Sequence, residues 1–93
     1  MRKYESLFIF HPELKEERLQ QKIEEVDKFI TRSKGKPVNI KKMGREKLPY
    51  PIKKCSEGFY VVFDFEIKPE EVDKFKKNFL KDGEVLRYSV IRK

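Results

Sequence analysis

The sequence predicts an α+β fold with elements in the order strand, helix, strand, strand, helix, strand. Two segments place apolar residues at helical spacing, and four others are rich in β-branched and aromatic residues that alternate with period two. Prolines and single glycines separate these segments. A chain of 93 residues is long enough for one modest core, so residues 1–93 are predicted to form a single domain.

The first strand is predicted over residues 3–10. Both of its faces are largely apolar, which indicates a central position in a sheet. His11-Pro12 ends the strand, because proline cannot donate a hydrogen bond to a neighbouring strand. The predicted faces are Tyr4, Ser6, Phe8 and Phe10 on one side and Glu5, Leu7 and Ile9 on the other.

The first helix is predicted to run for about five turns and to end before Gly35. Acidic residues cluster near its start and basic residues near its end, which complements the helix dipole. Its apolar stripe is Leu19, Ile23, Val26 and Ile30, widened by Phe29.

The two middle strands differ in character. Residues 37–48 alternate apolar residues with lysines, which is typical of an edge strand that resists pairing with other chains. Residues 59–67 alternate strictly and form the clearest strand of the sequence. Between them, the proline-rich segment 49–52 leads into a predicted loop at residues 53–58.

The second helix is predicted to begin at Lys68-Pro69, with proline in its first turn, and to end at Asp82-Gly83. Its buried stripe is Val72, Phe75 and Phe79. Residues 84–92 form the last predicted strand. Its faces are Leu86, Tyr88 and Val90 on one side and Arg87, Ser89 and Ile91 on the other.

This order of elements predicts the ferredoxin-like arrangement, βαββαβ, a four-stranded antiparallel sheet with two helices on one face. The other face of the sheet stays open. Several apolar side chains together are seldom exposed without use, so we expect a protein partner on this face. The predicted protein-partner face consists of Leu7, Ile9, Tyr60, Val62 and Ile91.

The positive charge is concentrated in one part of the chain. The net charge is +7, and residues 34–54 hold eight basic residues and one acidic residue, 8 − 1 = +7, so the rest of the chain is neutral. This distribution favours a surface that faces a polyanion. The alternative is a solvated, lysine-rich hairpin.

Several other function classes fit the sequence poorly. It has no glycine-rich phosphate loop and no assembled nucleophile and base, so we expect neither an enzyme nor a small-molecule substrate. One cysteine, Cys55, and one histidine, His11, cannot form a zinc site, so no metal or cofactor is expected. No apolar run reaches the length of a membrane span, and we expect a cytoplasmic protein without membrane contact.

Residues 57–64 have a superficial likeness to the RNA-recognition motif, which shares this fold. The leading basic residue of that motif is Glu57 here, and the last aromatic is Asp64, which would place a negative charge against RNA. Core packing therefore explains the aromatic residues of this segment better.

Residues 43–54 carry the resemblance to a known family. They read Met-Gly-Arg-Glu-Lys-Leu-Pro-Tyr-Pro-Ile-Lys-Lys, and Gly58 with an aromatic pair follows. This pattern resembles the signature of bacterial small-subunit ribosomal protein S-six, in which glycine and basic residues precede Leu-Ala-Tyr-Pro-Ile. Residues 1–5 and 85–88 are also similar to that family, so the resemblance covers the whole chain. Pro49 replaces the usual alanine and would stiffen the hairpin.

The resemblance implies a structural constituent of the small ribosomal subunit, in the cytoplasm, with no enzymatic activity. It also implies binding to the central domain of small-subunit (16S) ribosomal RNA together with ribosomal protein S-eighteen. Lysine and arginine would then supply affinity through phosphate contacts. The predicted RNA-contacting residues are Arg2, Lys3, Lys42, Arg45, Lys47, Lys53, Lys54, Arg87 and Arg92.

Two alternatives stay open at this point. The chain could be a free-standing RNA- or peptide-binding module of the same fold, which uses its open sheet face for a peptide or for self-association. Tyr50, bracketed by prolines, either packs its ring under the loop and locks the hairpin or offers the ring to RNA.

Overall fold

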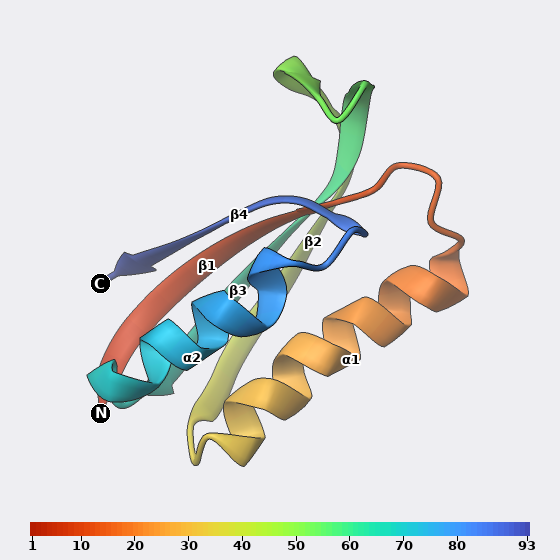
Figure 1. The fold of residues 1–93 in the computed structure, drawn as a ribbon. Coiled ribbons are helices and arrows are strands. Elements are labelled where there is room, and N and C mark those ends of the chain that lie inside the picture. Colours follow the sequence, from red (N-terminus) through yellow and green to blue (C-terminus); the bar gives the residue numbers. More distant parts are fainter.

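The computed structural model describes all of residues 1–93 and confirms the predicted ferredoxin-like fold (Figure 1). Strands β1 (Arg2–Phe10), β2 (Lys36–Ile52), β3 (Cys55–Ile67) and β4 (Val85–Arg92) form one antiparallel sheet in the order β2-β3-β1-β4. Helices α1 (Glu16–Arg32) and α2 (Pro69–Leu80) cover one face of this sheet. β1 is central and β2 lies at an edge, as the sequence predicts. Neither helix has the length and apolar content that a membrane-spanning helix requires.

The core lies between the helices and the covered face of the sheet. Phe8 is fully buried there, and its ring meets those of Phe63, Phe75 and Phe79 edge to face, with centroids 5.3, 5.9 and 5.1 Å away. Ser6 is also buried on this face, and its hydroxyl donates a hydrogen bond of 2.9 Å to the carbonyl oxygen of Ser89. The one polar side chain that the sequence places in β1 toward the core is therefore satisfied.

The junction between α1 and β2 depends on a close approach of the backbone to β3. The Gly35 N–H donates to the carbonyl oxygen of Ile30 at 2.9 Å, and Lys34 has a positive φ of 61°, which together close a Schellman motif. A Cβ on Gly35 would lie 2.1 Å from Ile67 Cγ2 and 2.7 Å from the carbonyl oxygen of Glu66. Glycine is therefore required at this position for space, whereas the positive φ falls on the lysine before it.

The β2–β3 hairpin is longer than predicted. β2 continues to Ile52 and β3 begins at Cys55, so the predicted loop at residues 53–58 is wrong. Strand pairing is irregular between Lys47 and Ile52, where two prolines occur, and an edge strand tolerates them because one side of it has no neighbour.

The turn of this hairpin consists of Lys53 and Lys54 alone. Their φ angles are 50° and 66°, and positive φ at both central positions is the requirement of a type I′ turn. Asparagine and glycine usually fill such a turn, because other side chains are strained there. The hairpin therefore carries two cations at its tip at some cost in conformational energy.

A bulge in β4 changes the predicted face of one residue. The pairing of β1 with β4 shifts between Ile9 and Phe10, which leaves Leu86 as an extra residue. Leu86 therefore does not share the covered face with Tyr88, as the simple alternation predicts. It packs with Ile9 and Leu48 in a second, smaller cluster on the open side of the sheet.

Ion pairs that the sequence did not predict join α1 to the start of β4. Arg18 donates to Glu84 from Nε at 3.0 Å and from Nη2 at 2.6 Å, and Lys22 pairs with Asp82 and, at 3.1 Å, with Glu25. Burial of the Lys22 ammonium opposes its charge, but the hydrogen bonds to Asp82 and Glu25 outweigh burial and raise the pKa of Lys22. The hydrogen bonds from Arg18 lower the pKa of Glu84.

Candidate nucleic-acid and protein interface

Strand β2 lies at an edge of the sheet (Figure 1) and carries most of the excess positive charge of the chain. Every residue from Val38 to Lys47 is exposed, because β2 pairs with β3 on one side only. The only buried residue of the strand is Leu48. The charge that the sequence concentrates in this segment therefore lies on an accessible surface, which we call the basic edge. It consists of Lys36, Lys41, Lys42, Arg45, Lys47, Lys53 and Lys54.

The structure divides the predicted RNA-contacting residues into two groups, all of them exposed. The larger group lies on the basic edge or directly beside it, and the smaller group lies at the opposite end of the sheet, where β1 begins and β4 ends. The larger group therefore forms one surface, and the smaller group lies apart from it. The larger group is Lys42, Arg45, Lys47, Lys53, Lys54 and Arg87, and the smaller is Arg2, Lys3 and Arg92.

Two basic side chains of β2 contact other segments of the chain. Lys42 Nζ donates to Gln20 Oε1 of α1 at 2.7 Å. Arg45 Nη2 donates to the carbonyl oxygen of Pro12 at 2.5 Å, and its guanidinium lies 5.2 Å from the centroid of the Phe59 ring. Lys42 therefore links β2 to α1, and Arg45 links β2 to the loop between β1 and α1 and covers a ring of β3.

Other contacts join the hairpin to the start of β4. The Arg87 guanidinium donates to the Tyr50 hydroxyl, and Lys53 Nζ donates to the carbonyl oxygen of Val85 at 3.3 Å. Tyr50 is 53% exposed, so its ring does not pack under the hairpin, and its hydroxyl makes the structural contact. Tyr50 thus restrains the hairpin through Arg87 and still offers its ring to a partner.

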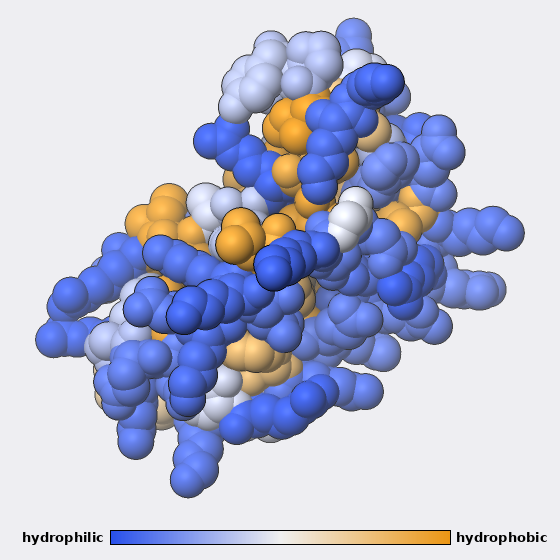
Figure 2. All heavy atoms as spheres, in the orientation of Figure 1, coloured by the Kyte–Doolittle hydropathy of each residue, from blue (hydrophilic) through white to orange (hydrophobic).

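The predicted protein-partner face is open at four of its five positions. Leu7, Tyr60 and Val62 are half-buried and Ile91 is 58% exposed, whereas Ile9 is buried under the hairpin. Figure 2 shows a largely hydrophilic surface on which apolar atoms gather beside this hairpin. A hollow of about 240 Å³ lies on the open face, lined by Leu7, Ile9, Pro49, Ile52, Tyr60, Arg87 and Ser89.

The far end of the open face is charged. Lys93 Nζ lies 2.9 Å from Asp64 Oδ1 and 3.5 Å from Glu5 Oε2. The hydrogen bond to Asp64 raises the pKa of Lys93. An apolar partner surface is therefore expected to contact the part of this face that lies near the hairpin.

The structure also brings Cys55 and His11 together, which are 44 residues apart in the sequence. Cys55 Sγ lies 3.5 Å from His11 Nε2, and His11 Nδ1 accepts a hydrogen bond of 3.2 Å from the Glu13 N–H. This chain of contacts ties the hairpin turn to the loop between β1 and α1. No three histidine, cysteine or acidic side chains come together in a way that could hold a metal ion.

Comparison with known proteins decides the family. The sequence profile of the family described as "Ribosomal protein S6" matches residues 3–92. The chain belongs to this family. A solved structure, 30S ribosomal protein S6 from Thermotoga maritima, matches with a TM-score of 0.93 and 34% identity over 99% of this chain and 87% of that chain.

Relatives of this family share about a third of their residues with the chain. The small ribosomal subunit protein bS6 of Clostridium novyi is 37% identical, over 98% of this chain and 96% of the relative. That of Caldanaerobacter subterraneus is 36% identical, over 99% and 97%. The chain spans 51% of the length of the protein from Gloeothece citriformis, with 35% identity.

Membership in the family confirms several expectations from the sequence. Ribosomal protein S6 is a structural, RNA-binding protein of the small ribosomal subunit in the cytoplasm, and it is not an enzyme. The resemblance of residues 43–54 to this family is therefore confirmed.

Proposed function

We propose that the chain binds the central domain of 16S ribosomal RNA together with ribosomal protein S-eighteen. The observation that carries this proposal is the net charge of +7 in residues 34–54, most of which lies on the exposed edge strand β2 and its hairpin turn. A dense row of cations on an edge strand favours a polyanion such as RNA over a neutral partner.

The two surfaces bind different partners, one RNA and the other protein. The basic edge contacts phosphates, and the apolar part of the open face contacts ribosomal protein S-eighteen. The surfaces meet at the hairpin, where Arg87 lines the hollow of the open face and also contacts Tyr50. The two partners can therefore bind at the same time, and each can extend the contact surface of the other.

Lys47 and Lys54 test the RNA side most directly. Their side chains are exposed and form no hydrogen bond or ion pair within the chain. Replacing them therefore removes charge without breaking a contact within the fold. Lys76 and Lys77 of α2 are a matched control, because they are also exposed and carry the same charge away from the basic edge.

The experiment measures binding to the central domain of 16S ribosomal RNA over a series of salt concentrations, with and without ribosomal protein S-eighteen. We expect affinity that depends on the partner and falls by orders of magnitude from low to moderate salt. The double substitution Lys47→Ala/Lys54→Ala should weaken binding and reduce the slope of log K against log salt by about 2. Lys76→Ala/Lys77→Ala should behave like the wild type.

Two results would contradict the proposal. One is the absence of binding at low salt even when ribosomal protein S-eighteen is present. The other is an equal loss of affinity in both double variants, which would mean that only total charge matters. Binding that hardly responds to salt would instead support a free-standing module that uses apolar contacts.

A further inference from the structure

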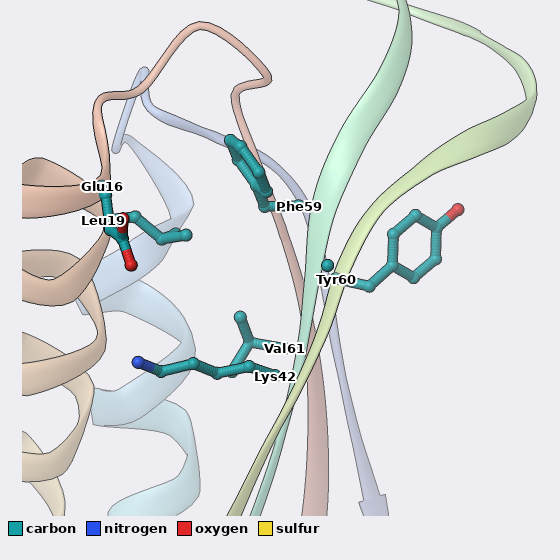
Figure 3. Close-up of a pocket in the computed structure, with 7 residues that line it drawn as sticks. Glu16, Leu19, Lys42, Phe59, Tyr60 and Val61 are labelled. Atoms are coloured by element: carbon teal, nitrogen blue, oxygen red, sulfur yellow. The ribbon is translucent and has the colours of Figure 1, made fainter.

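The largest cavity of the molecule lies at the seam between the first turns of α1 and strands β2 and β3 (Figure 3). Its volume is about 300 Å³, and we call it the α1–β2 slot. Glu16 and Leu19 point into it from α1, and Lys42 crosses from β2 toward the helix, whereas the ring of Tyr60 points away to the open face. The slot is lined by Glu16, Leu19, Lys42, Gly44, Phe59, Tyr60 and Val61.

The walls of the slot are apolar and one side is open. Leu19 and Phe59 pack against the core but are only half-buried, so the slot leaves part of both side chains accessible. Gly44 contributes no side chain at the β2 wall, and a Cβ built there would meet nothing within 4 Å. A flat group can therefore enter over Gly44 and lie between the helix and Phe59.

The rim of the slot is polar and carries both signs of charge. Lys42 uses one donor for Gln20 and keeps its others free, and the Arg45 guanidinium lies over the Phe59 ring. Across the slot, the Glu16 carboxylate makes no ion pair or hydrogen bond within the chain. It is therefore a free acceptor beside an apolar wall.

These features match the shape and chemistry of a nucleotide, whose base has apolar faces and polar edges and whose phosphate is anionic. The slot has the volume of the smallest pockets for small molecules, which begin at roughly 300 Å³, so it suits one flat ring system. An aliphatic side chain from a protein partner would cover the Glu16 carboxylate without pairing it, which is costly. A base supplies N–H donors to that carboxylate and leaves its phosphate with Lys42.

We propose that the α1–β2 slot holds one unstacked nucleobase of the RNA that this chain binds. Phe59 and Leu19 contact the faces of the base, Glu16 accepts its N–H donors, and Lys42 contacts its phosphate or carbonyl oxygen. This inference rests on the proposed RNA-binding function and adds a site that reads a single exposed nucleotide. Stacking on an aromatic ring tolerates any base, so the carboxylate supplies the preference among bases.

Guanosine 5′-monophosphate is the first probe, because guanine has adjacent N–H donors for the carboxylate and an O6 acceptor for Lys42. Titration of the full chain, followed by amide NMR, should shift the signals of Leu19, Gly44 and Phe59 at millimolar concentrations. Ribose 5-phosphate, which lacks the base, should leave the signals of Leu19 and Phe59 in place and perturb only residues of β2.

A variant whose side chain fills the slot tests whether the slot contributes to RNA binding. Leu19→Phe places a larger side chain in the slot without changing the charge of the basic edge, and Leu80→Phe is the control, at a position on α2 that is 66% exposed. Leu19→Phe should reduce affinity for the RNA roughly 10-fold in the presence of ribosomal protein S-eighteen and abolish the response to the nucleotide. Leu80→Phe should match the wild type, and circular dichroism checks that both variants fold.

The outcomes separate this inference from the proposed function. If Leu19→Phe binds RNA like the wild type while Lys47→Ala/Lys54→Ala is weakened, the base site is wrong and RNA binding through phosphates stands. If ribosomal protein S-eighteen alone shifts the slot signals, a protein side chain fills the slot and the inference is overturned. If the chain binds no RNA, the proposed function fails. The nucleotide titration then decides the base site alone: shifts of the slot signals with guanosine 5′-monophosphate but not with ribose 5-phosphate support the site, and their absence overturns it.

Discussion

The two faces of the sheet contain similar apolar residues but use them differently. On the covered face, Phe8 is completely buried and its ring meets aromatic rings from β3 and α2. On the open face, Leu7 and Val62 pair across β1 and β3 but stay half-buried. The comparison shows that apolar content alone does not separate a core from a binding surface. What decides is whether another element of the same chain covers the residues.

The largest expected effect on the free energy of unfolding comes from truncating a core side chain of the covered face. Phe8→Ala should lower the free energy of unfolding by about 3–5 kcal/mol, because it leaves a cavity among rings that cannot collapse into it. Val62→Ala on the open face should cost about 1 kcal/mol or less, since its side chain is only partly removed from water. Urea unfolding followed by tyrosine fluorescence measures both. Equal losses would contradict the distinction between the faces.

A smaller loss of stability is expected at Gly35, where the backbone between α1 and β2 lies close to β3. Gly35→Ala should lower the free energy of unfolding by about 1–3 kcal/mol, because the added Cβ collides with Ile67 and with the carbonyl oxygen of Glu66. Gly83→Ala is the matched control, since a Cβ there meets nothing within 4 Å. Thermal unfolding of the two variants should therefore differ, and a tolerated Gly35→Ala would show that β3 can move.

Substitution of the hairpin turn should raise the stability of the protein and lower its affinity for RNA. Asparagine and glycine adopt positive φ angles with less strain than lysine does. Replacing Lys53-Lys54 by Asn-Gly should therefore raise the free energy of unfolding by about 1 kcal/mol. The same variant removes two cations from the basic edge and should bind RNA more weakly. Denaturant unfolding and RNA binding of one preparation test both parts. Improved stability with unchanged RNA affinity would remove the turn lysines from the RNA contact.

The smallest expected effect is on the pH dependence of stability. The lowered pKa of Glu84 means that its contribution is present above the ordinary value of 4.5 and is lost as pH falls through the folded-state pKa. Glu84→Gln should remove this part of the acid destabilisation, while stability above pH 5 falls slightly as the pairing with Arg18 is lost. The effect is small because both side chains are partly exposed. Unfolding curves of both proteins between about pH 3 and 7 measure it.

Local patterns predicted the fold well because each one acts over a few residues. The stripe of α1 and the alternation of β3 depend only on helical and strand geometry, and both are present as predicted. The position of the net charge also follows from the sequence alone. By contrast, the bulge at Leu86 and the two-residue turn at Lys53-Lys54 do not alter the residue pattern, so periodicity could not reveal them.

The predicted binding residues show the same division. The exposure of the predicted RNA-contacting residues follows from composition and alternation, but their division into two groups does not. The sequence could not show that Lys42 reaches α1, that Ile9 is covered by the hairpin, or that the α1–β2 slot exists. Each of these depends on contacts between segments that are far apart in the chain.

The sequence by itself determined the order of elements, the aromatic core face, the basic edge and the family. Only the tertiary structure decided which apolar residues remain accessible, which acidic residues pair with the buried Lys22, and where a cavity forms beside the basic edge. The physical reason is the range of the interactions. Backbone periodicity and charge are properties of a segment, whereas burial and cavities arise only when distant segments pack together.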